Sequence, residues 1–267
     1  MGQWRIDSFP EGSSRCWCSP ASGNQRATHF GKLYSGTSGW NANDTSDSLP
    51  PPAFEYFQRQ AAIGRLLSQP NLLPLVGFEL ECSQPLLVYP RIAARPMAQW
   101  LLQQTHSPTL PELLRVAHQL MLALQSLHAA GYSHGALHEQ HVLVDAAQRV
   151  TLVGLGSCEP IGRRTQLTRV ASRFDPPEVH EGPFEASSAQ DVYSVAFLLG
   201  RLLGRSFLAA PLGRAMLSPL PDARPTTSEL ASLLEDLQTR TVGRLQPRCR
   251  SGETRATVAD SDFRRAA

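Results

Sequence analysis

The chain contains very little lysine. Lys32 is its only lysine, although lysine and arginine together number 25, so arginine provides nearly all of the positive charge. The formal net charge is only +2, and a balance so close to zero does not indicate a nucleic-acid or membrane-surface partner.

The sequence also lacks long apolar runs, and its cysteines are few. No apolar stretch reaches the ~18 residues typical of a membrane-spanning helix. The start MGQWRIDSFP lacks the apolar segment of a secretory signal, and Ile6 stands where an N-myristoylation signal requires Ser or Thr. The five cysteines are too sparse for a disulfide framework. We therefore expect reduced thiols and an intracellular, cytoplasmic protein.

The chain does contain enough apolar residues for a globular core. Its hydrophobic fraction is 42%, which argues against extended disorder. Apolar residues recur at helical or strand spacing in several segments. Helices are predicted over 53–67, 97–104, 111–131, 188–204 and 226–238, and strands over 29–36, 72–80, 85–92, 141–145 and 150–156.

Three segments lack this periodicity. Residues 1–25 and 239–267 are predicted to be a disordered arm and a disordered tail, and residues 37–52 form a polar linker that ends in prolines. Between them, strands and one helix come first and helices dominate afterwards. This order predicts a small α/β lobe followed by a larger helical lobe.

Several stretches, taken in order, resemble the landmarks of a protein kinase domain. They are HFGKLYSG for the end of the glycine-rich loop, FQRQAAIGRLLSQPNLLPLVGF for helix C, YSHGALHEQHVLVD for the catalytic loop, VTLVGLG for the strand ending in Asp-Phe-Gly, DPPEV for the end of the activation segment, QDVYSVAFLL for the supporting helix and DARPT for a late turn. The resemblance implies an α+β, two-lobed protein-kinase-like fold with a reduced β-rich N-lobe over 26–95 and a mainly helical C-lobe over 96–238. PNLLPLVGF and LLVYPRI resemble the tyrosine-kinase-like branch.

The resemblance also implies that the catalytic groups are replaced. The family pattern His-Arg-Asp-Leu-x-x-x-Asn falls on 134–141, so Ala136 replaces the aspartate that accepts the substrate proton and His141 replaces a magnesium-binding asparagine. Gly154 replaces the aspartate of Asp-Phe-Gly, and Gln60 replaces the helix C glutamate. No metal site and no binding of ATP or magnesium is therefore expected.

The family's lysine is expected to be missing too. Its strand should lie in 37–53, which contains no lysine. Lys32 precedes Leu33, whose counterpart faces the adenine. Because successive strand residues point to opposite faces, Lys32 is predicted to point outward. A vestigial cleft is expected at Gly31, Leu33 and Leu143.

The structural residues of the family are kept. Glu178 and Arg224 match a glutamate and an arginine that pair inside the larger lobe, and Asp191 matches an aspartate that holds the catalytic-loop backbone. His134 and Leu137 match residues that pack that loop. The resemblance thus implies a pseudokinase, a catalytically inactive domain that binds other proteins as a scaffold or regulator in signalling, with an active kinase or a signalling receptor as the kind of partner expected.

Two other functions remain open. A weakly active or atypical ATP-dependent kinase could use displaced residues. A metal-binding protein could use His134, His138 and His141, whose spacing suits zinc only if the stretch is helical. In addition, Arg163, Arg164, Arg169 and Arg173 surround Thr165, Thr168 and Ser172, which indicates either a solvated loop or a docking surface for an acidic or phosphorylated partner.

Overall fold

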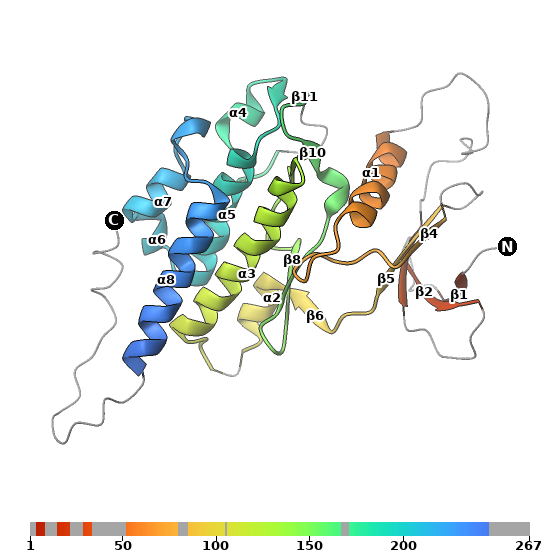
Figure 1. The fold of residues 1–267 in the computed structure, drawn as a ribbon, viewed down its shortest axis with the longest axis horizontal. Coiled ribbons are helices and arrows are strands. Elements are labelled where there is room, and N and C mark those ends of the chain that lie inside the picture. The colour runs from red at the N-terminus through yellow and green to blue at the C-terminus, as the bar shows by residue number, and fades with distance from the viewer. Residues whose placement is uncertain are drawn as a thin grey trace.

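Strands gather at one end of the molecule and helices at the other. The computed structural model describes residues 4–8, 15–21, 29–33, 52–79, 85–104, 106–166 and 171–245. Helix α1 (Pro52–Leu66) lies between the sheet and the helical bundle (Figure 1). The molecule is therefore a two-lobed mixture of α and β structure, as predicted.

The smaller lobe is built on a five-stranded antiparallel sheet. Its strands are β1 (Trp4–Ser8), β2 (Arg15–Pro20), β3 (His29–Leu33), β4 (Gly77–Glu79) and β5 (Leu86–Pro90), in the order β1-β2-β3-β5-β4. The sheet is curled, because the Trp4 indole on one edge strand lies against Gly77 on the other. A Cβ at position 77 would collide with that ring, so the curl requires glycine there.

The two faces of the sheet bury different residues. Inside the curl, Cys16 and Cys18 pack with Leu86 and Val88, and Leu33 joins them. The other face packs Phe30, Leu87 and Tyr89 against Phe57 and Ala61 of α1. Side chains on β3 alternate between these faces, as strand geometry requires.

Two expectations for this lobe are wrong. Residues 1–25 were expected to form a disordered arm, but they contain β1 and β2, and Cys16 and Cys18 are buried. The third strand is His29–Leu33, because it pairs with both β2 and β5. The sequence prediction placed it in 37–53, of which residues 37–51 lie outside the described part of the chain and Pro52 begins α1.

The larger lobe is mainly helical. Its long helices are α3 (Leu110–Ala129), α5 (Ser188–Leu203) and α8 (Thr227–Leu245), and its shorter ones are α2 (Met97–Leu102), α4 (Pro177–His180), α6 (Ser206–Ala209) and α7 (Pro211–Met216). The lobe also contains small strand pairs and two 3-10 turns, of which η1 contacts α1. They are β6 (Ala94–Pro96), β7 (Tyr132–Ser133), β8 (Val142–Asp145), β9 (Val150–Leu152), β10 (Glu159–Pro160), β11 (Arg164–Thr165), β12 (Phe184–Glu185), η1 (Leu155–Ser157) and η2 (Pro221–Ala223).

Local sequence sets the boundaries of these helices. At the start of α3, the Glu112 carboxylate accepts hydrogen bonds from the Thr109 N–H (2.7 Å) and hydroxyl (2.8 Å). Gly131, at φ +84°, follows its end. Helix α8 continues to Leu245, so residues 239–245, which were expected to belong to the disordered tail, are helical. Within the described part of the chain, no helix has the length and apolarity needed to cross a bilayer.

Candidate functional site

A cleft of about 560 Å³ lies between the sheet and the helical lobe. The sequence prediction placed Gly31, Leu33 and Leu143 in this cleft. Leu143 lines it, but Gly31 and Leu33 belong to the interior of the curled sheet. The cleft is lined instead by their strand neighbours Phe30 and Lys32, together with Tyr56, Gln60, Tyr89, Arg91, His141 and Gly154.

Lys32 points into the cleft, so the prediction that it points outward is wrong. Its ammonium group donates a hydrogen bond of 2.9 Å to Oε1 of Gln60 on α1 and lies 5.0 Å from the centre of the Tyr56 ring. The alternation argument was sound, but it started from the wrong strand. Since His29–Leu33 is the third strand, the even-numbered residues face α1.

The imidazole of His141 fills the space beside Gly154. A Cβ added to Gly154 would lie 2.7–2.8 Å from three atoms of that ring, and φ is +89° at this glycine. His141 is held in place because its Nδ1 is 2.7 Å from the Ala136 carbonyl oxygen and therefore donates to it. No side chain at 154 larger than hydrogen fits this arrangement without a shift.

The imidazole rings of the three histidines in the catalytic-loop stretch lie close together. His138 and His141 have ring centroids 3.9 Å apart, and His134 lies 5.4 Å from His141. His134 is buried and its Nε2 donates to the Val153 carbonyl oxygen at 2.9 Å. Among the residues that the structure describes, no three His, Cys, Asp or Glu side chains are arranged to hold a metal ion.

Two more glycines allow close contacts around this loop. The Tyr56 ring on α1 packs against Gly156 so tightly that a Cβ there would overlap the ring. At Gly135, φ is +71° and a Cβ would lie 2.9 Å from the Ser157 carbonyl oxygen. Together with Gly154, these positions let the segment after β9 settle onto the catalytic-loop stretch and α1.

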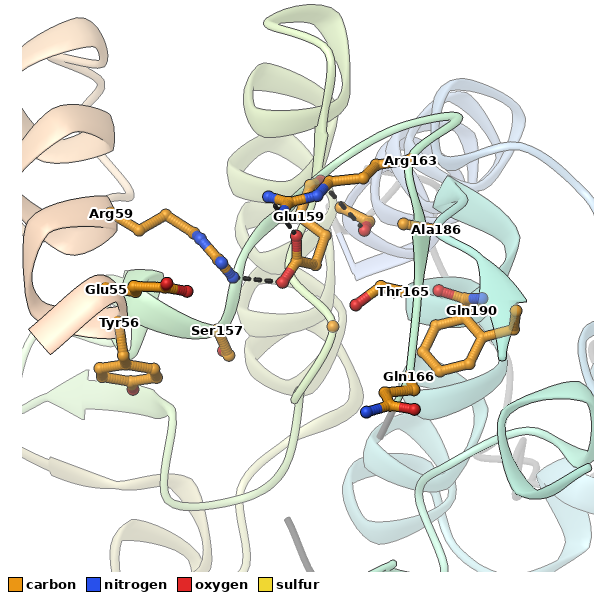
Figure 2. A pocket seen from close by; sticks show the side chains of 13 residues that line it. Glu55, Tyr56, Arg59, Ser157, Glu159, Arg163, Thr165, Gln166, Ala186 and Gln190 are labelled. Carbon is orange, nitrogen blue, oxygen red and sulfur yellow. Dashed lines mark hydrogen bonds and ion pairs between the residues drawn. The ribbon is translucent and has the colours of Figure 1, made fainter. Parts of the chain in front are cut away.

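A second cavity, of about 290 Å³, lies between α1 and the segment after β9 (Figure 2). Figure 2 shows Arg59 reaching from α1 to the carboxylate of Glu159, with Arg163 on its other side. Arg59 also donates to the Cys158 carbonyl oxygen at 3.2 Å. This wall therefore contains charged groups of both signs, paired with each other.

The helical lobe holds two buried polar centres. Arg224, only 6% exposed, makes two parallel hydrogen bonds to Glu178, of 2.7 and 2.8 Å. Asp191, 1% exposed, accepts hydrogen bonds from the backbone N–H groups of His134 (2.7 Å) and Gly135 (3.0 Å) and from His128 (2.8 Å). Burial alone would raise the pKa of the Asp191 carboxyl, but these hydrogen bonds hold it below its usual value.

Comparison with known proteins agrees with this geometry. A profile of the protein tyrosine and serine/threonine kinase family matches residues 46–204, more than half of the chain. This chain belongs to the protein kinase family.

Curated relatives of the kinase domain share low identity with it. It is 29% identical over 135 residues to Tyrosine-protein kinase Dnt of Drosophila melanogaster, covering 46% of the chain and 22% of that relative. It is 25% identical over 179 residues to Serine/threonine-protein kinase PknD of Mycobacterium tuberculosis, covering 65% of the chain and 27% of that relative. The chain thus spans about a quarter of the length of these relatives.

Placed on the family pattern, the kinase domain contains one of the groups predicted to be absent. Lys32 lies on the third strand and donates to Gln60 on α1, which corrects the expectation that no strand lysine reaches this helix. That Gln60 replaces the family's paired glutamate stays a prediction. His141 contacts both Ala136 and Gly154; that these three residues replace catalytic groups of the family stays a prediction.

Sequence reasoning missed Tyr56, Arg59 and Glu159. All three join α1 of the kinase domain to the segment after β9, and their positions follow no family motif used in the prediction. The alternation in RCWCSP (15–20), with Cys16 and Cys18 on one face, could have revealed β2 and therefore the correct number of strands before α1.

Proposed function

We propose that this kinase-family domain is catalytically inactive and works by binding other proteins in signalling. The observation that supports this most is the imidazole of His141, which fills the space beside Gly154. In active kinases that space belongs to groups that hold magnesium on the nucleotide.

The chemistry of the remaining side chains agrees with the proposal. Magnesium prefers oxygen ligands in a nearly octahedral arrangement, and neither an imidazole nor a glycine at these positions offers a carboxylate or amide oxygen. Ala136, at the position of the catalytic base, has no group that accepts a proton. These residues do not fit a magnesium ion, so we propose no phosphoryl-transfer step in this cleft.

A kinase fold that does not transfer phosphate can still bind other proteins through its surface. The relatives carry the names tyrosine-protein kinase and serine/threonine-protein kinase, which makes signalling the natural setting. The fold positions α1, residues 154–166 and the surface of the helical lobe with internal hydrogen bonds, and such fixed surfaces suit docking of a partner at low entropic cost.

A weakly active kinase is the second candidate, and the position of Lys32 favours it. A lysine that reaches the cleft from the third strand could contact the phosphates of a nucleotide. Its partner, however, is the neutral amide of Gln60 instead of a carboxylate.

A thermal-shift titration separates the two candidates. The chain is heated with ATP alone, with ATP and magnesium, and with ATP and EDTA, beside a Lys32→Ala variant. Under our proposal, magnesium adds nothing to any effect of ATP. A ligand at ~100 times its dissociation constant stabilises by about 2.7 kcal/mol, which raises the melting temperature by several degrees. A shift of that size that needs magnesium and disappears in Lys32→Ala would favour the active kinase.

A further inference from the structure

Helix α1 is attached to the helical lobe by charged side chains that no catalytic motif includes. Glu159 lies on β10, whose backbone pairs with Ser133 of β7, so its main chain is fixed in the helical lobe. Its carboxylate reaches across to Arg59 on α1, and Arg163 lies 3.4 Å from its other oxygen. The carboxylate therefore has two guanidinium groups beside it: Arg59 donates a hydrogen bond from α1, and Arg163 forms an ion pair without a hydrogen bond (Figure 2).

The Arg59–Glu159 pair is shielded from water. The side chains are 21% and 17% exposed, so their attraction is screened less than that of an ion pair on the open surface. By contrast, Arg173 is 67% exposed and lies 3.4 Å from Glu139. Arg59 gains a second anchor from the Cys158 carbonyl oxygen at 3.2 Å, and a guanidinium with two acceptors loses less on ordering per bond formed.

A second contact holds the same helix one turn earlier. The Tyr56 ring, packed against Gly156, fixes the start of α1 on η1, and burial raises the pKa of the Tyr56 hydroxyl. Tyr56 and Arg59 are three residues apart and therefore lie on one face of the helix. Both contacts are made to the short segment 156–159, so the helix and that segment are joined at two points.

We propose that Glu159 is a built-in anchor for helix α1, which holds the helix against the helical lobe through the chain's own side chains. Glu159 and Arg59 are then positioning residues, and a nucleotide adds little to the placement of α1. The face that α1 and residues 156–159 present together is preformed. This inference goes beyond the proposed function and does not depend on it, since an active domain could be anchored in the same way.

Hydrogen exchange of the full chain, followed by mass spectrometry, tests the anchor. In Glu159→Gln, the amides of α1 should exchange about tenfold faster than in the wild type, since the lost contact is a partly buried, charge-assisted hydrogen bond. The amides of the buried helix α3 should exchange at their wild-type rate. Arg59→Ala should act like Glu159→Gln, whereas Arg173→Ala, which removes an exposed arginine from an ion pair, should leave α1 unchanged.

A charge-swapped variant excludes a merely general loss of stability. Arg59→Glu combined with Glu159→Arg should bring α1 exchange back to within about threefold of the wild type, because the pair is re-formed with opposite polarity. Equal acceleration in α1 and α3, or no acceleration in either single variant, would overturn the proposal. So would strong additional protection of α1 in the wild type on adding ATP and magnesium.

Discussion

The helical lobe and the cleft differ in the polar residues that they contain. In the helical lobe, Glu178, Arg224 and Asp191 are buried or half-buried and are fully engaged by precise hydrogen bonds. Around the cleft, Ala136 and Gly154 carry no polar side chain, and the imidazole of His141 occupies the space beside Gly154. The buried charges of the helical lobe therefore hold the fold, and removing one partner of such a pair is costly; that the catalytic charges are lost is our proposal.

Removing a buried charge from the helical lobe should have the largest effect on stability. In Arg224→Ala, Glu178 loses both of its hydrogen bonds from the guanidinium. We expect the free energy of unfolding to fall by about 3–5 kcal/mol, measured by urea denaturation. Arg214→Ala, on the exposed side of α7, is the matched control and should change stability by less than ~0.5 kcal/mol. A small effect of Arg224→Ala would show that the pair is dispensable.

Replacing Asp191 should have the second-largest effect on stability. In Asp191→Asn, the charged acceptor of the His134 and Gly135 N–H groups is lost, and we expect a fall of about 3 kcal/mol at neutral pH. The folded pKa lies below the unfolded value, so this stabilisation is present above about pH 4 and lost as pH falls through the folded pKa. The difference between wild type and variant should therefore shrink in acid. A difference independent of pH would contradict this assignment.

The packing of His141 beside Gly154 can be tested by introducing the family's aspartate at position 154. Gly154→Asp places a side chain against His141 at a positive φ, so we expect a loss of about 2 kcal/mol. Adding His141→Asn removes the ring and should return part of that loss, whereas His138→Ala should return less. If Gly154→Asp alone is neutral in thermal unfolding, the imidazole does not fill the site.

Sequence alone predicted the helical lobe well and the smaller lobe poorly, for a physical reason. Helix α3 has broad apolar periodicity, a capping Thr109 and a following Gly131, so each level of the sequence indicates the same structure. Strands β1 and β2 are only five and six residues long, and the alternation in 15–20 was overlooked among the Ser, Gly and Pro residues around it. Missing them shifted the strand count, which placed Lys32 on the wrong face. The anchor at Arg59 and Glu159 depends on contacts a hundred residues apart and no local pattern reveals it.

Thiol reactivity should show the smallest effect, confined to the smaller lobe. Burial raises the pKa of the Cys18 thiol to about 12, and burial likewise raises the pKa of Cys16. Because the thiolate is the nucleophile, both should resist iodoacetamide at neutral pH in the native chain and react after unfolding in urea. Peptide mass spectrometry checks this residue by residue. Rapid native labelling of Cys16 or Cys18 would mean that the curled sheet opens readily.

Phosphoryl transfer by the purified chain is the most direct test of the central claim. The chain is incubated with radiolabelled ATP, magnesium or manganese, and a generic protein acceptor, beside Lys32→Ala and a catalytically competent kinase. The account expects no label on the acceptor or on the chain itself above the Lys32→Ala background. Label that accumulates in the wild type and disappears in Lys32→Ala would contradict it.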